Sequence, residues 1–110
     1  MEPAKGKLGV MCVGLGAVTT TFMTGVLMAR KGLAKPVGSM TQYDKIRVGR
    51  GKDKKYLHYG EIVPLTSLND IVFGAWDVYP ENAYESALNA EVLRDRDIEP
   101  VRDELKAIVP

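Results

Sequence analysis

The feature that most constrains the fold is a strand, a glycine-containing turn, a helix and a second strand ending in an acid, all between Lys7 and Asp77. The first strand is a short run rich in apolar residues (7–13), and Gly14-Leu15-Gly16 follows it directly. Two glycines in this place suit a chain that turns sharply while its backbone touches a pyrophosphate. Thr19-Thr20-Thr21 would then open a helix whose free N–H groups and positive dipole end face the phosphates. The pattern therefore predicts a dinucleotide-binding turn.

The glycine pattern is incomplete, because Thr19 stands where its third glycine would be. A bare G-x-G also occurs where a strand-to-helix turn needs glycine only for a positive φ. The turn alone leaves two interpretations open, a nucleotide site and a purely structural turn.

The acid that usually binds the ribose lies about 20 residues beyond the glycines, at the end of the second strand. Residues 70–77 form an apolar run typical of a parallel strand covered by helices, and the run ends at Asp77. An irregular excursion over residues 34–69 accounts for the longer spacing. Asp44 is nearer to the glycines but follows no apolar strand, so we prefer Asp77. The competing role for Asp77 is a cap of the turn after the strand.

Three helices are expected, one from Ala17 to Gly32, one after an Asn82/Glu85 capping box, and one capped by Asp97 with Pro100 in its first turn. The apolar positions expected on their inner faces are Val18, Phe22, Val26 and Ala29 in the first, Tyr84, Leu88 and Val92 in the second, and Ile98, Val101, Leu105 and Ile108 in the third. Residues 45–48 alternate as a short edge strand would. Strands alternating with helices predict an α/β fold, a partial Rossmann-like domain with a parallel sheet and an inserted excursion.

Length and charge suggest that the chain works with other parts. With 110 residues it has room for one domain, whereas a dinucleotide enzyme usually also carries a substrate region. Residues 1–60 hold eleven Lys and Arg against three Asp and Glu, and residues 61–110 hold four against eleven, which together give the totals of 15 and 14. This asymmetry favours pairing within an assembly over nucleic-acid binding. The basic stretch 50–55 lacks a dense aromatic platform and is expected to be a solvated loop.

Two further features bear on the compartment. The lone Cys12 excludes an internal disulfide and fits a reduced, cytoplasmic setting. Residues 8–29 carry no charge and are long enough to cross a bilayer. However, this stretch contains four glycines, four threonines and a β-branched first half, which make a poor isolated helix. We therefore expect no membrane span, and a membrane-anchored or oligomerising non-enzyme remains a rival hypothesis.

Four segments taken together (14–21, 38–42, 69–77 and 82–84) resemble, in this order, the N-terminal part of the myo-inositol-1-phosphate synthase (inositol-3-phosphate synthase) family. The most specific part is Gly-Ser-Met-Thr-Gln at 38–42 with a strand ending in Gly-Ala-Trp-Asp downstream. The resemblance implies the NAD-binding part of a cytoplasmic, homotetrameric isomerase that converts glucose 6-phosphate to inositol phosphate. In this family NAD oxidises C5 of the open sugar, C6 attacks the C1 aldehyde, and the hydride returns, with no net redox change.

By the family pattern, the cofactor-binding residues are those of the turn together with the acid that ends the second strand: Gly14, Leu15, Gly16, Ala17, Val18 and Thr19 at the pyrophosphate, and Asp77 at the adenosine ribose. Many members have an asparagine pair where this chain has Val18-Thr19.

The family's catalytic lysines, its sugar-phosphate residues and its tetramer-forming sheet lie beyond the matched region. No catalytic residue and no metal site is therefore assigned within residues 1–110, and the chain alone is expected to be inactive. Nothing aligns Lys52, Lys54, Lys55 or His58 with those roles. A cofactor domain of another NAD(P)-dependent oxidoreductase remains an alternative.

Overall fold

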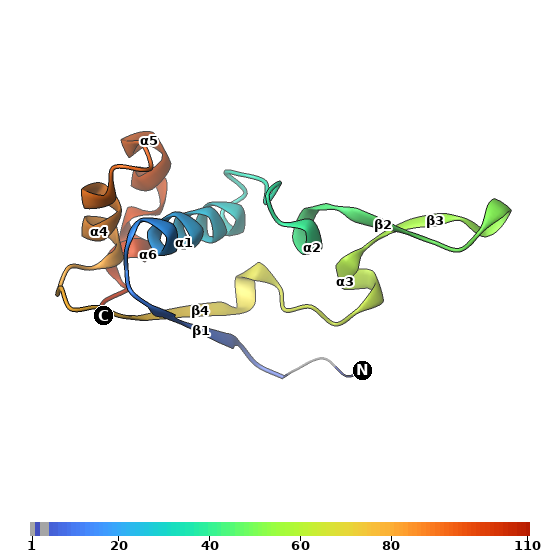
Figure 1. The fold of residues 1–110 in the computed structure, drawn as a ribbon, viewed down its shortest axis with the longest axis horizontal. Helices are drawn as coiled ribbons and strands as arrows, with labels where there is room; N and C mark the ends of the chain where they lie inside the picture. Colours follow the sequence, from blue (N-terminus) through green and yellow to red (C-terminus); the bar gives the residue numbers. More distant parts are fainter. Residues whose placement is uncertain (1, 3–4) are drawn as a thin grey trace.

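The structure is a computed structural model and describes residue 2 and residues 5–110. Its helices and strands are β1 (Leu8–Val13), α1 (Ala17–Arg30), α2 (Met40–Tyr43), β2 (Lys45–Val48), β3 (Lys55–His58), α3 (Tyr59–Ile62), β4 (Ile71–Trp76), α4 (Ala83–Ala90), α5 (Asp95–Ile98) and α6 (Arg102–Lys106), with 3-10 turns at Gly51–Asp53, Leu68–Asp70 and Glu99–Val101. Figure 1 shows β1, β4 and the helices α1 and α4–α6 gathered at one end, while the β2–β3 hairpin projects at the other.

The central feature is a parallel pair, with β1 beside β4 in register from Leu8 opposite Ile71 to Val13 opposite Trp76. The helix α1 and the whole excursion lie between these strands in the sequence, as expected for a crossover connection. Phe73 of β4 meets Phe22 of α1 edge-on, with ring centroids 5.6 Å apart. The predicted mixed α/β class with a parallel sheet is confirmed.

Helices cover only one face of this sheet in the described part of the chain. On the other face Met11, Val13, Val72 and Trp76 stay exposed, Val13 at 82% and Trp76 at 63%. The expectation that helices cover both faces of the second strand is therefore not met within the described residues. Within those residues no helix packs on these four apolar side chains.

The core lies between α1 and the C-terminal helices, and it corrects the expected helix faces. Of the expected inner positions of α1, Val26 is buried, but Val18 is 85% exposed and Phe22 is 45% exposed. The other buried residues of the helix are Thr20, Met23, Thr24 and Leu27. The threonines tolerate burial because Thr20 Oγ1 donates to the Gly16 carbonyl at 2.9 Å and Thr24 Oγ1 to the Thr20 carbonyl at 2.7 Å. The choice of face follows from packing against α4 and α6, which a pattern of apolar residues within α1 does not record.

In α4, Ala83 and Ala87 are buried and Tyr84 packs partly buried against the core, as expected, while Leu88 stays exposed. Val92 lies beyond the end of the helix at Ala90 and is also exposed. Small side chains let α4 lie close to α1. In the third predicted helix the expected face is confirmed, since Ile98, Val101 and Leu105 are fully buried and Ile108 packs against them.

That third helix is interrupted, and Asp97 does not begin it. It divides into α5, a 3-10 turn containing Pro100, and α6. The carboxylate of Asp97 accepts the Arg94 N–H at 3.2 Å from the third position of α5, so Arg94 is the capping residue. Pro100 has no N–H for a continuous helix, which explains the break.

The ends of α1 are fixed as the sequence predicts. Gly32 has φ +70 and donates its N–H to the Ala29 carbonyl at 3.1 Å, which ends the helix. Arg30 then joins the helix to the start of β4, because its guanidinium donates to the carbonyls of Leu68 and Ile71.

The capping box at the start of α4 is confirmed, with Asn82 Oδ1 accepting the Glu85 N–H at 2.9 Å and Glu85 Oε2 accepting the Asn82 N–H at 3.2 Å. We expect Asn82→Ala to lower the free energy of unfolding by about 1 kcal/mol, because the helix loses an acceptor for one free N–H. Denaturant unfolding measures the change. Asn82→Asp keeps the acceptor and should stay within a few tenths of a kcal/mol of the parent; an equal loss in both variants would contradict the capping role.

The excursion contains an antiparallel hairpin in which β2 pairs with β3, from Lys45 opposite His58 to Val48 opposite Lys55. The strand at 45–48 was predicted, but its partner was not. The basic loop forms the hairpin tip, where Gly49 and Gly51 have positive φ.

None of the helices in the described part of the chain has the length and apolar character needed to cross a bilayer.

Candidate cofactor site

The two glycines of the first turn serve different purposes. Gly14 has φ +98 and donates its N–H to the Trp76 carbonyl at 2.7 Å, so the fold itself favours glycine there. Gly16 has φ −100, which other residues also adopt. A Cβ added to Gly16 would meet nothing within 4 Å. The fold places no demand for glycine at Gly16, and it leaves open space directly before α1.

The helix α1 presents an open N-terminus to this space. Its capping residue is Gly16, which supplies no side-chain cap, and its first turn contains no acid. The first helical residues Ala17, Val18 and Thr19 carry N–H groups without an intrahelical acceptor. In the described part of the chain no other protein oxygen accepts them, and the first bond of the series runs from the Thr20 N–H to the Gly16 carbonyl at 2.9 Å. Such an end favours an anion.

The helix begins at Ala17, as its apolar pattern predicts, so Thr19, Thr20 and Thr21 lie within its first turns and do not open it. Thr20 and Thr21 turn their hydroxyls back and donate to the carbonyls of Gly16 and Ala17, the second at 2.7 Å. They brace the first turn of the helix, so the free donors are backbone groups.

Asp77 at the end of β4 is bound to the glycine turn. Its Oδ2 accepts the Leu15 N–H at 2.7 Å, and its Oδ1 accepts the Tyr79 N–H at 3.0 Å. These backbone hydrogen bonds, that from Leu15 first, lower the pKa of the carboxyl group below its usual value. Asp77 is therefore ionised at neutral pH and links the carboxyl ends of the two parallel strands.

Asp44, the nearer acid by spacing, does not reach the turn. It follows α2 in the excursion, where its carbonyl lies 3.3 Å from His58 Nδ1. Lys52, Lys54 and Lys55 lie around the hairpin tip. The structure thus brings Asp77, and neither Asp44 nor the basic loop, to the glycines.

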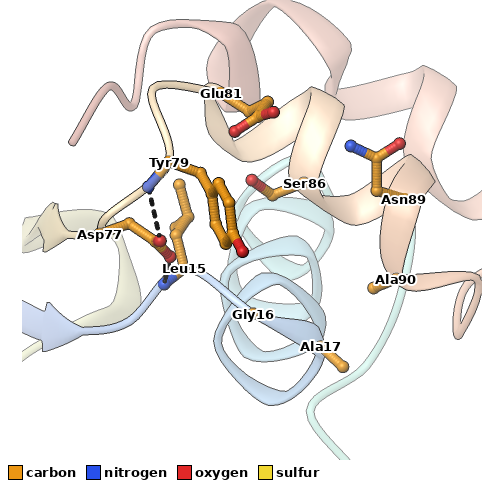
Figure 2. Close-up of a pocket in the computed structure, with 9 residues that line it drawn as sticks. All are labelled: Leu15, Gly16, Ala17, Asp77, Tyr79, Glu81, Ser86, Asn89 and Ala90. Atoms are coloured by element: carbon orange, nitrogen blue, oxygen red, sulfur yellow. Dashed lines mark hydrogen bonds between the residues drawn. The ribbon is translucent and has the colours of Figure 1, made fainter.

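A cleft of about 460 Å³ opens where the turn, Asp77 and α4 meet. Its lining comprises predicted residues and residues that the sequence analysis missed: Leu15, Gly16, Ala17 and Asp77 in the first group, and Tyr79, Glu81, Ser86, Asn89 and Ala90 in the second. Figure 2 shows Asp77 and Tyr79 on one side and Ser86 and Asn89 of α4 on the other. Gly14, Val18 and Thr19 do not line it.

Part of this lining carried a sequence signal. Tyr79 and Glu81 directly follow the strand that ends in Asp77, and loops at the carboxyl ends of parallel strands commonly form ligand clefts. Ser86 and Asn89 are three residues apart on one face of α4. That this face meets the glycine turn depends on long-range packing, which a single sequence does not display.

Comparisons with known proteins point to one family over nearly the whole chain. An NAD-binding family model described as myo-inositol-1-phosphate synthase matches residues 8–110. Inositol-3-phosphate synthase 1 of Bacteroides thetaiotaomicron is 53% identical over 111 residues, covering 100% of this chain and 25% of that protein. Inositol-3-phosphate synthase 1 of Oryza sativa subsp. japonica is 37% identical over 117 residues, covering 94% of this chain and 23% of that protein.

A solved structure gives the same answer for the fold. The crystal structure of inositol-3-phosphate synthase from Caenorhabditis elegans matches with a TM-score of 0.83 and 26% identity, over 99% of this chain and 24% of that one. The chain spans about a quarter of the length of the curated relatives it matches.

Proposed function

The chain belongs to the myo-inositol-1-phosphate synthase family, and we propose that residues 1–110 form the N-terminal portion of an NAD-binding Rossmann-like domain in a longer enzyme. The complete enzyme would convert glucose 6-phosphate to inositol phosphate in the cytoplasm as a homotetramer. The catalytic and tetramer-forming residues would come from outside this chain. NAD, the cofactor of the family, would supply the hydride acceptor and donor of that reaction.

The observation that carries the proposal is the meeting of three features at one cleft: the open space at Gly16, the uncapped N-terminus of α1 and the ionised Asp77. The backbone N–H groups of Ala17, Val18 and Thr19 would bind the pyrophosphate, which approaches closely because Gly16 has no side chain. Gly14 and Leu15 would hold the turn in shape through their bonds to Trp76 and Asp77.

The two roles considered for Asp77 are compatible. An ionised carboxylate has about four acceptor sites. Leu15 and Tyr79 occupy two of them, which leaves two for the hydroxyls of the adenosine ribose. We therefore assign Asp77 both to the shape of the turn and to the ribose.

Replacing Asp77 tests this assignment. Asp77→Ala in the complete enzyme should weaken NAD binding about 10- to 100-fold, since hydrogen bonds to a charged group are worth roughly 1.5–3 kcal/mol. NADP binding should weaken far less, because the 2′-phosphate makes no hydrogen bond to the carboxylate and is repelled by its charge. Calorimetric titration with both cofactors measures the difference. Equal losses for the two cofactors would reduce Asp77 to a cap of the turn.

The pH dependence provides a control for the same residue. The pKa of Asp77 is lower in the folded chain than in the unfolded chain, so its contribution to stability is fully present above the ordinary aspartate pKa. It is lost as the pH falls through the lowered pKa. In the parent, the contribution of Asp77 to the free energy of unfolding should therefore be constant from neutral to mildly acidic pH and should decline only in stronger acid. The Asp77→Asn variant should lack that part of the acid decline in the free energy of unfolding.

A further inference from the structure

All the charged side chains that line the cofactor cleft are negative. The cleft is lined by 9 residues, of which Asp77 and Glu81 carry carboxylates and none is a lysine, arginine or histidine. The remaining polar side chains are those of Tyr79, Ser86 and Asn89. A ligand group that lies between Asp77 and Glu81, away from the N-terminus of α1, therefore meets only negatively charged and neutral side chains.

The fold does not use the charge of Glu81. Glu81 is half-buried in the segment between β4 and α4, and in the described part of the chain its carboxylate makes no hydrogen bond and no ion pair. The neighbouring acid Glu85, by contrast, caps α4, and Glu104 pairs with Lys31 at 2.6 Å. Figure 2 shows Glu81 above Tyr79 and near Ser86, on the α4 side of the cleft.

The carboxylate of Glu81 bears on which of the two related cofactors, NAD or NADP, can bind in the cleft. NAD and NADP differ only at the 2′ position of the adenosine ribose, which the ribose-binding acid contacts in folds of this type. A 2′-phosphate carries a charge of about −1.5 to −2 near neutral pH, and sites that accept it usually provide an arginine. Two carboxylates without a cation would repel that phosphate, whereas a 2′-hydroxyl can donate a hydrogen bond to Asp77.

We propose that Glu81 is a specificity-determining residue that excludes NADP from the cleft, acting beside Asp77. This inference rests on the proposed cofactor function. The two acids then have different roles: Asp77 binds the ribose hydroxyls of NAD, and Glu81 repels the 2′-phosphate of NADP. Removing the charge of Glu81 should therefore change NADP binding and leave NAD binding nearly unchanged.

The experiment measures the Kd values of NAD and NADP by calorimetry for the complete enzyme and its variants. Glu81→Gln should lower the Kd of NADP about tenfold, the effect of removing one unit charge a few ångströms from the phosphate in a partly exposed site. Glu81→Lys should lower it further, and the Kd of NAD should stay within about twofold in both variants. Raising the salt concentration should reduce the discrimination of the parent enzyme more than that of Glu81→Gln.

Glu91→Gln is the matched control, because it makes the same charge change at the exposed end of α4, outside the cleft lining. Its NADP-to-NAD ratio should equal that of the parent. Equal shifts in Glu81→Gln and Glu91→Gln would reduce the effect to net charge and overturn the proposal.

The remaining outcomes are also decisive. An unchanged ratio in Glu81→Gln, with NAD binding intact, would overturn the role of Glu81 and leave the cofactor function standing. Loss of NAD affinity in that variant, with thermal unfolding unchanged, would make Glu81 a binding group instead of an excluding one. A parent enzyme that binds neither cofactor would overturn the proposed function itself. Should Glu81→Lys fail to fold, the isosteric Gln variant decides alone.

Discussion

Gly16→Val in the complete enzyme is expected to abolish NAD binding while the protein stays folded. The backbone at Gly16 has φ −100 and ψ −159, which valine adopts readily, and an added Cβ meets no protein atom within 4 Å. The new side chain would instead occupy the space before α1 where we place the pyrophosphate. We expect the Kd of NAD to rise at least about 100-fold, because the phosphates lose their approach to several backbone donors at once.

Calorimetry with NAD, together with thermal unfolding of the ligand-free protein, separates binding from folding in this experiment. The control is Gly25→Val, which makes the same substitution at an exposed glycine of α1 that also faces open space. It should bind NAD like the parent. An unchanged NAD affinity in Gly16→Val would show that the cofactor does not lie against this turn.

The second large effect concerns catalysis. The 110-residue chain alone is expected to form no inositol phosphate from glucose 6-phosphate at any concentration of NAD. The family's reaction needs a proton acceptor beside C6 of the sugar and groups that stabilise the developing oxyanions. Such groups typically contribute factors of about 10²–10³ or more each.

We assign neither task to a residue of this chain. Asp77 is engaged by two backbone N–H groups, and His58 lies at the end of β3 in the hairpin, outside the cleft lining. The assay should use purified chain of verified mass at saturating NAD, with the complete enzyme as the positive control. NAD-dependent product from the 110-residue chain would overturn both the proposed domain assignment and the proposal that the catalytic residues come from outside this chain.

The parts of the fold that could be predicted are those specified by neighbouring residues. The Gly14 turn, the end of α1 at Gly32 and the Asn82 capping box each depend on a backbone requirement or a hydrogen bond within a few positions. The apolar run that became β4 needed no more than its composition and length. Local chemistry was sufficient for these elements.

The errors arose where distant parts of the chain decide. In α1 the apolar Val18 is exposed and the more polar Thr20 is buried, the reverse of what their hydropathy predicts. The reason is that α4 and α6 pack on the threonine side of α1. The strand β3 was missed because a short exposed hairpin leaves little hydrophobic alternation to detect. The same reason limited the site, since the sequence indicated the turn and Asp77 but not the wall that α4 supplies.

The bare face of the β1–β4 sheet has a consequence for the cofactor turn. A two-stranded sheet is at best marginally stable without further packing, and among residues 5–110 this one is supported on the α1 side only. The glycine turn and Asp77 are attached to the carboxyl ends of these same strands, so any layer that covers Met11, Val13, Val72 and Trp76 also stiffens the turn. By thermodynamic linkage, a cofactor that holds the turn strengthens the attachment of that layer to the same extent. We therefore expect cofactor affinity and the attachment of such a layer to rise and fall together.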